Sequence, residues 1–163
     1  MLLLGSCFYI FEVNHKKMTP QIGEVFLMEN EQYFIDEQPL HQYFLTFNHP
    51  PYFTPPSPTC WRGYYGKWAL IDDQLYLINF RGYLDGFDEV DINYLFPLQE
   101  QVFANWYTGT IKVPQGKIVK WNDTLNASIY EEYLHLTFEN GVLTHYECKD
   151  SNYGKATETE LSH

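Results

Sequence analysis

The sequence predicts an all-β protein, an antiparallel meander of hairpins that forms a curved sheet, a barrel or a sandwich. Aromatic residues make up 18% of the chain, and aromatic side chains favour strands. No stretch shows the 3.6-residue apolar period of a helix. Short apolar stretches separated by turns are typical of an all-β fold. Four turn-like sequences recur, at Glu29-Asn30-Glu31, Asp72-Asp73, Pro114-Gln115-Gly116 and Glu139-Asn140-Gly141.

A single domain is expected from the length of 163 residues, which suffices to bury a sizeable core. Residues 59–149 are predicted to form the central hairpin core, and residues 150–163 a polar, peripheral tail. The N-terminal stretch Leu2–Val13 is predicted to be a first strand. The residues around Cys7 resemble a lipoprotein cleavage box, but the apolar run before them is too short for a signal peptide.

A small hairpin and a surface connection are predicted ahead of the core. The hairpin joins Glu24–Met28 to Tyr33–Asp36, and the following Pro39–Leu45 fits either a short helical turn or a loop. Five prolines lie within Asn48–Thr59. Because proline cannot donate a ladder hydrogen bond, this stretch is expected to run extended over the surface.

The stretch Thr59–Phe80 is the centre of the predicted fold. A two-residue turn at Asp72-Asp73 sets the register of its two strands, because turn length determines strand pairing. Both faces of this strand pair are largely apolar, which places it inside the fold rather than at an edge. The pairs that the register predicts include Leu70–Leu75, Trp68–Leu77, Tyr64–Arg81 and Arg62–Tyr83.

The same register brings the two arginines of the chain, Arg62 and Arg81, together at the open end of the hairpin. Tyr64 and Tyr83 flank them. A planar guanidinium suits carboxylate or phosphate, so these four residues are a candidate anion-binding site. The alternative, which the acidic composition favours, is that the arginines stack on the tyrosine rings and neutralise the acidic segment that follows.

That acidic segment, Gly82–Asp91, is predicted to be a solvated loop. Calcium binding is an alternative, but the spacing lacks the alternating oxygen ligands and the central glycine of an EF-hand loop. The segment is therefore a candidate docking surface for a basic partner rather than a metal site. Its acidic residues are Asp85, Asp88, Glu89 and Asp91.

Strands are also predicted in the next part of the chain. Ile92–Phe96 fits a short helix or a strand, and Gln101–Val113 is predicted to be a strand that ends at the turn Pro114-Gln115-Gly116. That turn folds the predicted strand back on itself. Trp121 then lies across the strand pair from Gly109 and covers it, which is a known way to stabilise such a gap.

The last predicted hairpin runs from Ile129–Phe138 through a turn with Gly141 to Val142–Cys148. Its register places His135 directly opposite His145. Two histidines across a strand pair can hold zinc or a similar metal, but no cysteine or carboxylate of obvious spacing completes a ligand set. A histidine pair without metal is expected, and no cofactor is predicted.

Charge and cysteine content narrow the class of partner and the compartment. Acidic residues outnumber basic ones by 21 to 10, for a formal net charge of −11. This balance argues against nucleic-acid binding, which needs a basic face, and suits a basic protein partner. Cys7, Cys60 and Cys148 form neither a CxxC pair nor a disulfide framework, so a cytoplasmic location is expected. No stretch approaches the length and apolar character of a membrane span, so no membrane partner is predicted.

Known catalytic motifs are missing: the chain contains no GxSxG, HExxH, Walker-type or GxGxxG sequence. The middle and C-terminal two thirds resemble small uncharacterised bacterial β-rich proteins, a resemblance that implies no activity. In size and acidity alone, the chain also resembles immunity proteins that neutralise bacterial toxins. The residues that carry the first resemblance are Trp61-Arg62-Gly63-Tyr64, Trp68, Leu75-Tyr76-Leu77, Leu95-Phe96-Pro97, Val102-Phe103-Ala104-Asn105-Trp106, Gly109 and Pro114-Gln115-Gly116.

These observations favour a non-catalytic, cytoplasmic binding protein of bacterial origin, an immunity protein that occludes a basic toxin domain. Two alternatives stay open. One is a small-ligand-binding protein or an enzyme with a pocket near Arg62 and Arg81. The other is a structural or oligomerising β domain.

Overall fold

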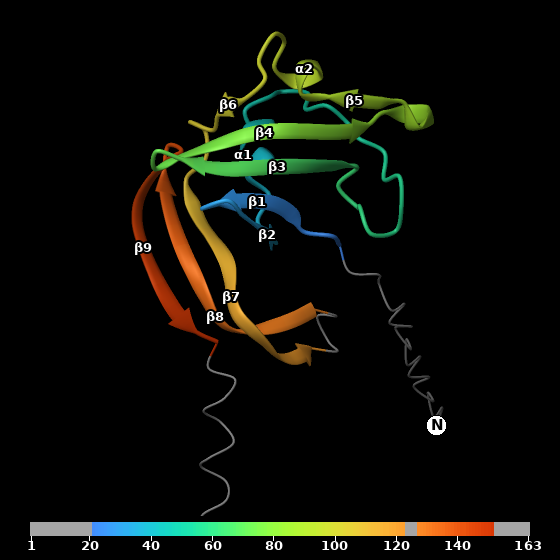
Figure 1. Ribbon diagram of the computed structural model, residues 1–163. Coiled ribbons are helices and arrows are strands. Elements are labelled where there is room, and N and C mark those ends of the chain that lie inside the picture. The colour runs from blue at the N-terminus through green and yellow to red at the C-terminus, as the bar shows by residue number, and fades with distance from the viewer. Residues whose placement is uncertain (1–20, 123–126, 152–163) are drawn as a thin grey trace, which may run out of the picture.

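The computed structural model describes residues 21–122 and 127–151, and its strands form one curved sheet (Figure 1). The predicted strand Leu2–Val13 and almost all of the predicted tail lie outside these ranges. The sheet has the strand order β2-β1-β3-β4-β9-β8-β7, with β5 and β6 also paired to β4. The elements are β1 (Glu24–Met28), β2 (Glu31–Ile35), α1 (Pro39–Phe44), β3 (Tyr64–Ile71), β4 (Gln74–Tyr83), the 3-10 turn η1 (Asp85–Phe87), β5 (Glu89–Asp91), α2 (Ile92–Leu95), β6 (Val102–Phe103), β7 (Gly109–Asn122), β8 (Ala127–Glu139) and β9 (Val142–Asp150).

The sheet is open and mixed. Its order begins at β2 and ends at β7, and β1 pairs with β3 in parallel. The prediction of a mainly β fold is confirmed, and among the predicted architectures the structure has the curved sheet. The prediction of a purely antiparallel meander is wrong at β1. There, α1 and the proline-rich connection form a crossover long enough for a parallel pair.

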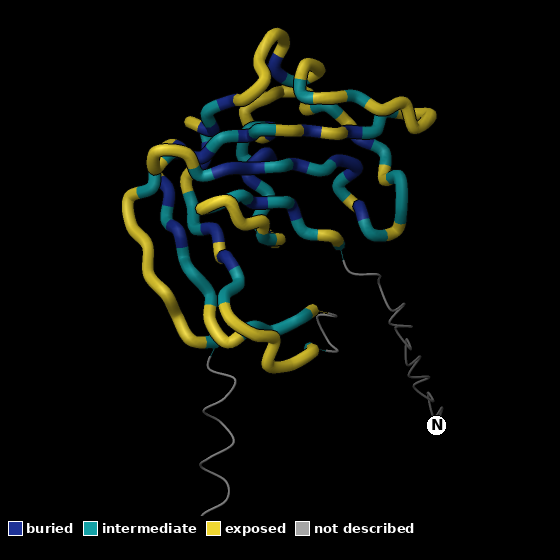
Figure 2. The backbone as a smooth tube through the Cα atoms, in the orientation of Figure 1, coloured by how far each residue is buried: buried dark blue, intermediate teal, exposed yellow. Residues whose placement is uncertain are grey.

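The core joins two parts of the sheet, one with β1, β3 and β4 and the other with β7 and β8. Trp68 of β3 is fully buried, as are Phe26 of β1 and Leu75 and Leu77 of β4, so the core position predicted for the central hairpin is confirmed. Figure 2 shows this buried stretch running along β3 and β4 and continuing into β7 and β8. The buried apolar residues from β7 and β8 are Ile111, Val113, Leu136 and Phe138.

Two tight turns set the register where the prediction succeeds. Asp72 and Asp73 both have positive φ, as do Glu29 and Asn30 between β1 and β2. Left-handed residues at both central positions give a two-residue turn the twist that matches its strands. The small N-terminal hairpin and the central pairs from Ile71–Gln74 back to Trp68–Leu77 are confirmed.

A bulge changes the register in the second half of the central hairpin. β4 contains one extra residue there, and Arg81 pairs with Tyr65 instead of Tyr64. By the same displacement, Tyr83 lies opposite Gly63, to whose carbonyl oxygen its N–H donates, and not opposite Arg62. Both predicted pairs are wrong for the same reason, because one inserted residue displaces every later pair in the ladder.

β7 departs most from the prediction. Pro114-Gln115-Gly116 lies inside one continuous strand that pairs with β8 along its length, and it is not a turn. Pro114 and Gln115 are paired, and a bulge follows them at Gly116. Gly116 has a φ of 74°, and Glu131 of β8 secures the bulge by accepting a 3.0 Å hydrogen bond from the backbone N–H of Lys117. Glycine supplies positive φ to a bulge as readily as to a turn, which explains the wrong assignment.

The pairing of β7 with β8 also changes two related predictions. Gly109 faces Phe138, and Trp121 faces Ser128, so the predicted cover of Gly109 by Trp121 is wrong. The predicted strand Gln101–Val113 is interrupted after β6, where the chain leaves the β4 edge before it enters β7.

The histidine pair predicted in the last hairpin is also wrong. The turn has two residues, Asn140 and Gly141, instead of the predicted three, and a bulge lies just beyond Thr137, so His135 faces Glu147 and His145 faces Thr137. The two histidines are therefore diagonal neighbours on one face of the sheet instead of a direct pair.

The proline-rich connection, residues 48–63, is here called the strap, and it contains no helix or strand. Its Phe53 is buried, with its ring 5.5 Å from Phe80 and 5.6 Å from Tyr64. At the end of β4, the backbone N–H of Thr54 donates to Tyr83 O at 2.7 Å, and the N–H of Tyr83 donates to Gly63 O at 3.0 Å. The strap is thus anchored to the core and to the end of β4.

Candidate functional site

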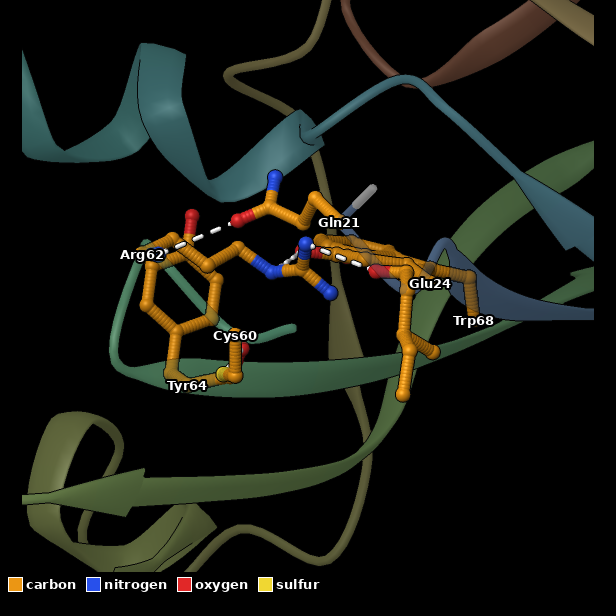
Figure 3. A network of polar contacts seen from close by, with 7 residues as sticks. Gln21, Glu24, Cys60, Arg62, Tyr64 and Trp68 are labelled. Carbon is orange, nitrogen blue, oxygen red and sulfur yellow. Dashed lines mark hydrogen bonds and ion pairs between the residues drawn. The ribbon is translucent and has the colours of Figure 1, made fainter. Parts of the chain in front are cut away.

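Arg62, the buried arginine of the strap, lies in a network of polar contacts (Figure 3). Its side chain is only 6% exposed, and its Nε lies 3.2 Å from Oε1 of Glu24. Its Nη1 donates to Ile22 O at 3.0 Å, and the backbone N–H of the same Arg62 donates to Gln21 Oε1 at 3.1 Å. The guanidinium carbon also lies 5.6 Å from the ring centre of Tyr64. These contacts hold the strap against the start of β1.

Glu24 is the acidic partner in this network, and its side chain is fully buried. Its Oε2 accepts a hydrogen bond from the indole N–H of Trp68. Burial raises its pKa to about 7, and Arg62 and Trp68 only partly offset that rise. Gly66 makes room for the carboxylate, since a Cβ there would collide with Glu24 Oε2.

Glu24 is not among the site residues predicted from the sequence. The available signal is its position two residues before Phe26 on a strand, since alternate strand residues share a face. Both side chains are buried. An acidic residue on an apolar face indicates a buried basic partner. Here that partner is Arg62, 38 positions later in the chain. Local pattern does not identify such a distant partner.

The second arginine has a different environment. Arg81 is exposed, and its Nε lies 3.2 Å from Oε1 of Glu89. A hydrogen bond with Tyr83 and the nearby Glu89 raise the pKa of Arg81. Each arginine therefore has its own carboxylate, one buried and one exposed. The alternative holds in part: Arg62 lies over the rings of Tyr64 and Tyr65, and Arg81 pairs with Glu89 of the acidic segment. The anion site at Arg62, Arg81, Tyr64 and Tyr83 stays a prediction.

The four predicted partner-binding acids lie on one exposed segment. Asp85 begins η1, Asp88 follows it, and Glu89 and Asp91 belong to β5, so the predicted solvated loop is in part an edge strand. All four are exposed. An open groove of about 420 Å³ is lined by Glu89, Val90, Asp91 and Tyr94. The Asp91 carboxylate also accepts a 2.9 Å hydrogen bond from Asn93 N and caps α2.

Exposed apolar side chains lie along the same segment. Phe87 is 61% exposed and Leu98 is 98% exposed, and both have a φ of 64°. Glycine or asparagine adopts such a backbone conformation at lower energy. Tyr94, 48% exposed, lies between them in the chain. Aromatic and apolar side chains are thus exposed to solvent among the carboxylates of this segment.

Residues 85–98 are here called the acidic edge. In Figure 1 the acidic edge forms the outer margin of the sheet, beside β4 and opposite β3. Among the described residues, no group of three or more His, Cys, Asp or Glu side chains is arranged to hold a metal ion. Within the same ranges, no helix has the length and apolar character needed to cross a bilayer.

Comparisons with models of known protein families, with curated proteins and with solved structures find no match to the chain. The class that the fold and the site define is an open-sheet β protein with an acidic, aromatic-bearing strand edge. Function is therefore inferred from the chemistry of that edge.

Proposed function

We propose that the protein is a non-catalytic binding protein whose acidic edge covers a basic surface of a protein partner. The main support is that one segment, the acidic edge, presents four exposed carboxylates together with the exposed side chains of Phe87, Tyr94 and Leu98. Carboxylates accelerate encounter with a basic surface and select against acidic ones. Apolar and aromatic side chains supply the buried contacts that slow dissociation.

In its most specific form, the proposal is that the chain is a bacterial immunity protein and the partner a basic toxin domain. The net charge of −11 favours a strongly basic partner such as a nuclease domain. Binding of the acidic edge would cover the cationic surface with which such a domain contacts nucleic acid. The protein itself needs no catalytic group for this role.

The small-ligand alternative has less support. Arg62 is 6% exposed and already paired with Glu24, and Arg81 is paired with Glu89. A ligand anion would have to compete with a carboxylate for either guanidinium. For a structural or oligomerising domain, the acidic edge is unsuitable as a contact between copies, because like charges would face each other.

The proposed partner is tested by co-expression and capture. If a neighbouring gene encodes the toxin, the immobilised protein is expected to retain that toxin. Co-expression of the protein is expected to restore growth of cells that the toxin inhibits. Failure of both capture and growth rescue would exclude the immunity role.

The proposed surface is tested with a double charge reversal, Asp85→Lys with Asp88→Lys. Both residues are exposed, and the change brings the formal charge from −11 to −7. At low salt we expect the association rate with the basic partner to fall about tenfold, with a smaller fall at high salt. The matched control is Glu31→Lys with Glu139→Lys, which makes the same charge change on exposed positions of β2 and β8. Equal slowing by both pairs would mean that net charge, not the acidic edge, guides association.

A further inference from the structure

β5 is an edge strand whose second side has no strand partner among the described residues. It pairs with β4 through Arg81–Asp91, Gly82–Val90 and Tyr83–Glu89. β4 also pairs with β3 over the same stretch, so β5 lies on the outside. An unpaired strand edge presents backbone N–H and C=O groups to solvent, and such edges accept further strands.

The hydrogen bonds of β4 determine which groups of β5 point outward. The N–H of Tyr83 donates to Gly63 O, and its C=O accepts from Thr54 N, so both groups of Tyr83 face the strap and β3. In a strand, backbone groups of successive residues alternate between the two edges. Gly82 therefore faces β5, and its partner Val90 faces back toward Gly82.

Glu89 and Asp91, on either side of Val90, consequently turn their backbone groups away from β4. The N–H groups of Glu89 and Asp91 and the C=O of Glu89 are therefore directed toward the open side, where a new strand could pair with them. The side chains of these two residues share one face, because they are two positions apart. The groove is lined by three successive residues of β5, Glu89, Val90 and Asp91, together with Tyr94. A groove on one face of a strand would contact only alternate residues, so this lining is expected of a groove along the edge of β5.

We propose that an extended, basic segment of the protein partner adds to β5 as a further strand. Its backbone pairs with Glu89 and Asp91, and its arginine or lysine side chains lie against the two carboxylates. The inference rests on the proposed function, because it assigns a conformation and a chemistry to the segment that the basic partner presents. Tyr94 offers a ring against which a guanidinium can stack. The exposed side chains of Phe87 and Leu98 lie before β5 and after Tyr94 in the sequence.

Charge complementarity selects this occupant over others. Carboxylates at Glu89 and Asp91 repel an acidic strand, and a second copy of this chain would bring the same two carboxylates into the pairing. Short length and charged side chains also protect an edge strand from unspecific pairing. A basic extended segment is the occupant that gains both the backbone hydrogen bonds and the ionic contacts.

The probe for this site is the peptide acetyl-Arg-Val-Arg-Val-Arg-amide, titrated into the 15N-labelled full chain at low salt. Before addition, the amide of Val90 should exchange slowly with solvent and those of Glu89 and Asp91 quickly. Saturating peptide is expected to slow exchange at Glu89 and Asp91 by about tenfold or more, since each gains a hydrogen bond. Binding without slower exchange at either amide would overturn the proposal.

A methylated peptide and two variants provide the controls. The same peptide with every backbone nitrogen methylated keeps the charge but has no amide donors, so it should bind at least about tenfold more weakly. Glu89→Pro removes an outward N–H at an edge position, whereas Glu89→Gln keeps it, so the proline variant should bind the unmethylated peptide about tenfold more weakly than the glutamine variant. Equal affinity in either comparison contradicts strand addition.

Failure of this inference and failure of the proposed function give different results. A native partner that is captured and is sensitive to Asp85→Lys with Asp88→Lys, while the peptide leaves the β5 amides unprotected, refutes strand addition only. A peptide that protects Glu89 and Asp91, while no basic protein is captured, supports the strand site and refutes the proposed partner.

Discussion

At the scale of the residue, Glu24 differs most from its surroundings. Its carboxylate is buried among apolar side chains, with Arg62 and Trp68 as its polar contacts. Burial disfavours the ionised form more strongly than these partners favour it, so the pKa rises from 4.5 to about 7. A buried ion pair of this kind is weak evidence for stability, but it specifies how the strap is placed against β1 and β3.

The pH dependence of stability is the first prediction. Because the folded-state pKa of Glu24 lies above its unfolded value, the folded chain binds more protons between pH 4.5 and about 7. The stability that Glu24 contributes is therefore full below pH 4.5, declines between pH 4.5 and about 7, and is lost above about pH 7. The rise in pKa corresponds to a loss of about 3 kcal/mol, at ~1.4 kcal/mol for each factor of ten. Urea unfolding of the wild type and of Glu24→Gln from pH 4.5 to 8 should show this difference, and parallel curves would contradict it.

Arg62→Met provides the control for that measurement. Without the guanidinium, the pKa of Glu24 should rise further, because Arg62 is the main group that lowers it. In Arg62→Met the decline should still begin near pH 4.5, but it should continue above pH 7 and its total should be larger. The double variant with Glu24→Gln should show no decline from this site. A decline that persists in the double variant would belong to another residue.

At the scale of the element, β5 and α2 form a short unit joined by Asp91. This side chain lines the groove and also caps α2 by accepting from Asn93 N. A helix of four residues depends on such a cap, because few of its backbone groups bond internally.

Substitution of Asp91 is the second prediction. Asp91→Ala should lower the free energy of unfolding by about 1 kcal/mol, whereas Asp91→Asn should change it by only a few tenths, since asparagine caps as well as aspartate does. Both variants remove the charge from the groove. Binding of the basic partner should therefore weaken in both, and denaturant unfolding separates the two effects. Retention of full affinity by Asp91→Asn would show that its carboxylate does not contact the partner.

The elements show where sequence reasoning succeeds and where it stops. The two-residue turn at Asp72-Asp73 is predicted correctly, because turn type depends on a few adjacent residues. The bulges in β4, β7 and β9 were not predicted, because an extra residue is accommodated only by the partner strand and its side chains. Glu131 at the β7 bulge is one such side chain, 14 residues from Lys117.

At the scale of the whole molecule, the two parts of the sheet meet through few backbone contacts. β4 and β9 pair only at Gln74–Val142. Gly141 accepts a 2.8 Å hydrogen bond from Leu75 N and donates one of 2.7 Å to Tyr107 O. It has a φ of 79°, and a Cβ at Gly141 would lie 2.5 Å from Ala104 O. This glycine is therefore the junction between β3–β4 and β7–β9.

The third prediction is that Gly141→Ala destabilises the whole fold. The alanine must adopt positive φ and displace the Ala104 backbone, so we expect a loss of more than about 2 kcal/mol and a broader, less cooperative unfolding transition. Gly86→Ala is the matched control, because Gly86 also has positive φ but a methyl group there would have no other atom within 4 Å. The control should lose about 1 kcal/mol from backbone strain alone. Equal losses in the two variants would remove the junction role from Gly141.

The sequence by itself determined the mainly β fold, the turn at Asp72-Asp73, the apolar residues of the central hairpin and the four acids of the acidic edge. These features depend on composition and on neighbours within a few residues, so they can be read locally. Only the tertiary structure decided that β1 pairs in parallel with β3, that Pro114-Gln115-Gly116 continues a strand with a bulge at Gly116, and that Arg62 is buried against Glu24. Each of these depends on contacts between residues far apart in the chain, which a local pattern does not specify. The edge of β5 belongs to the same group, since the direction of its backbone groups follows from the hydrogen bonds of the strap to Tyr83.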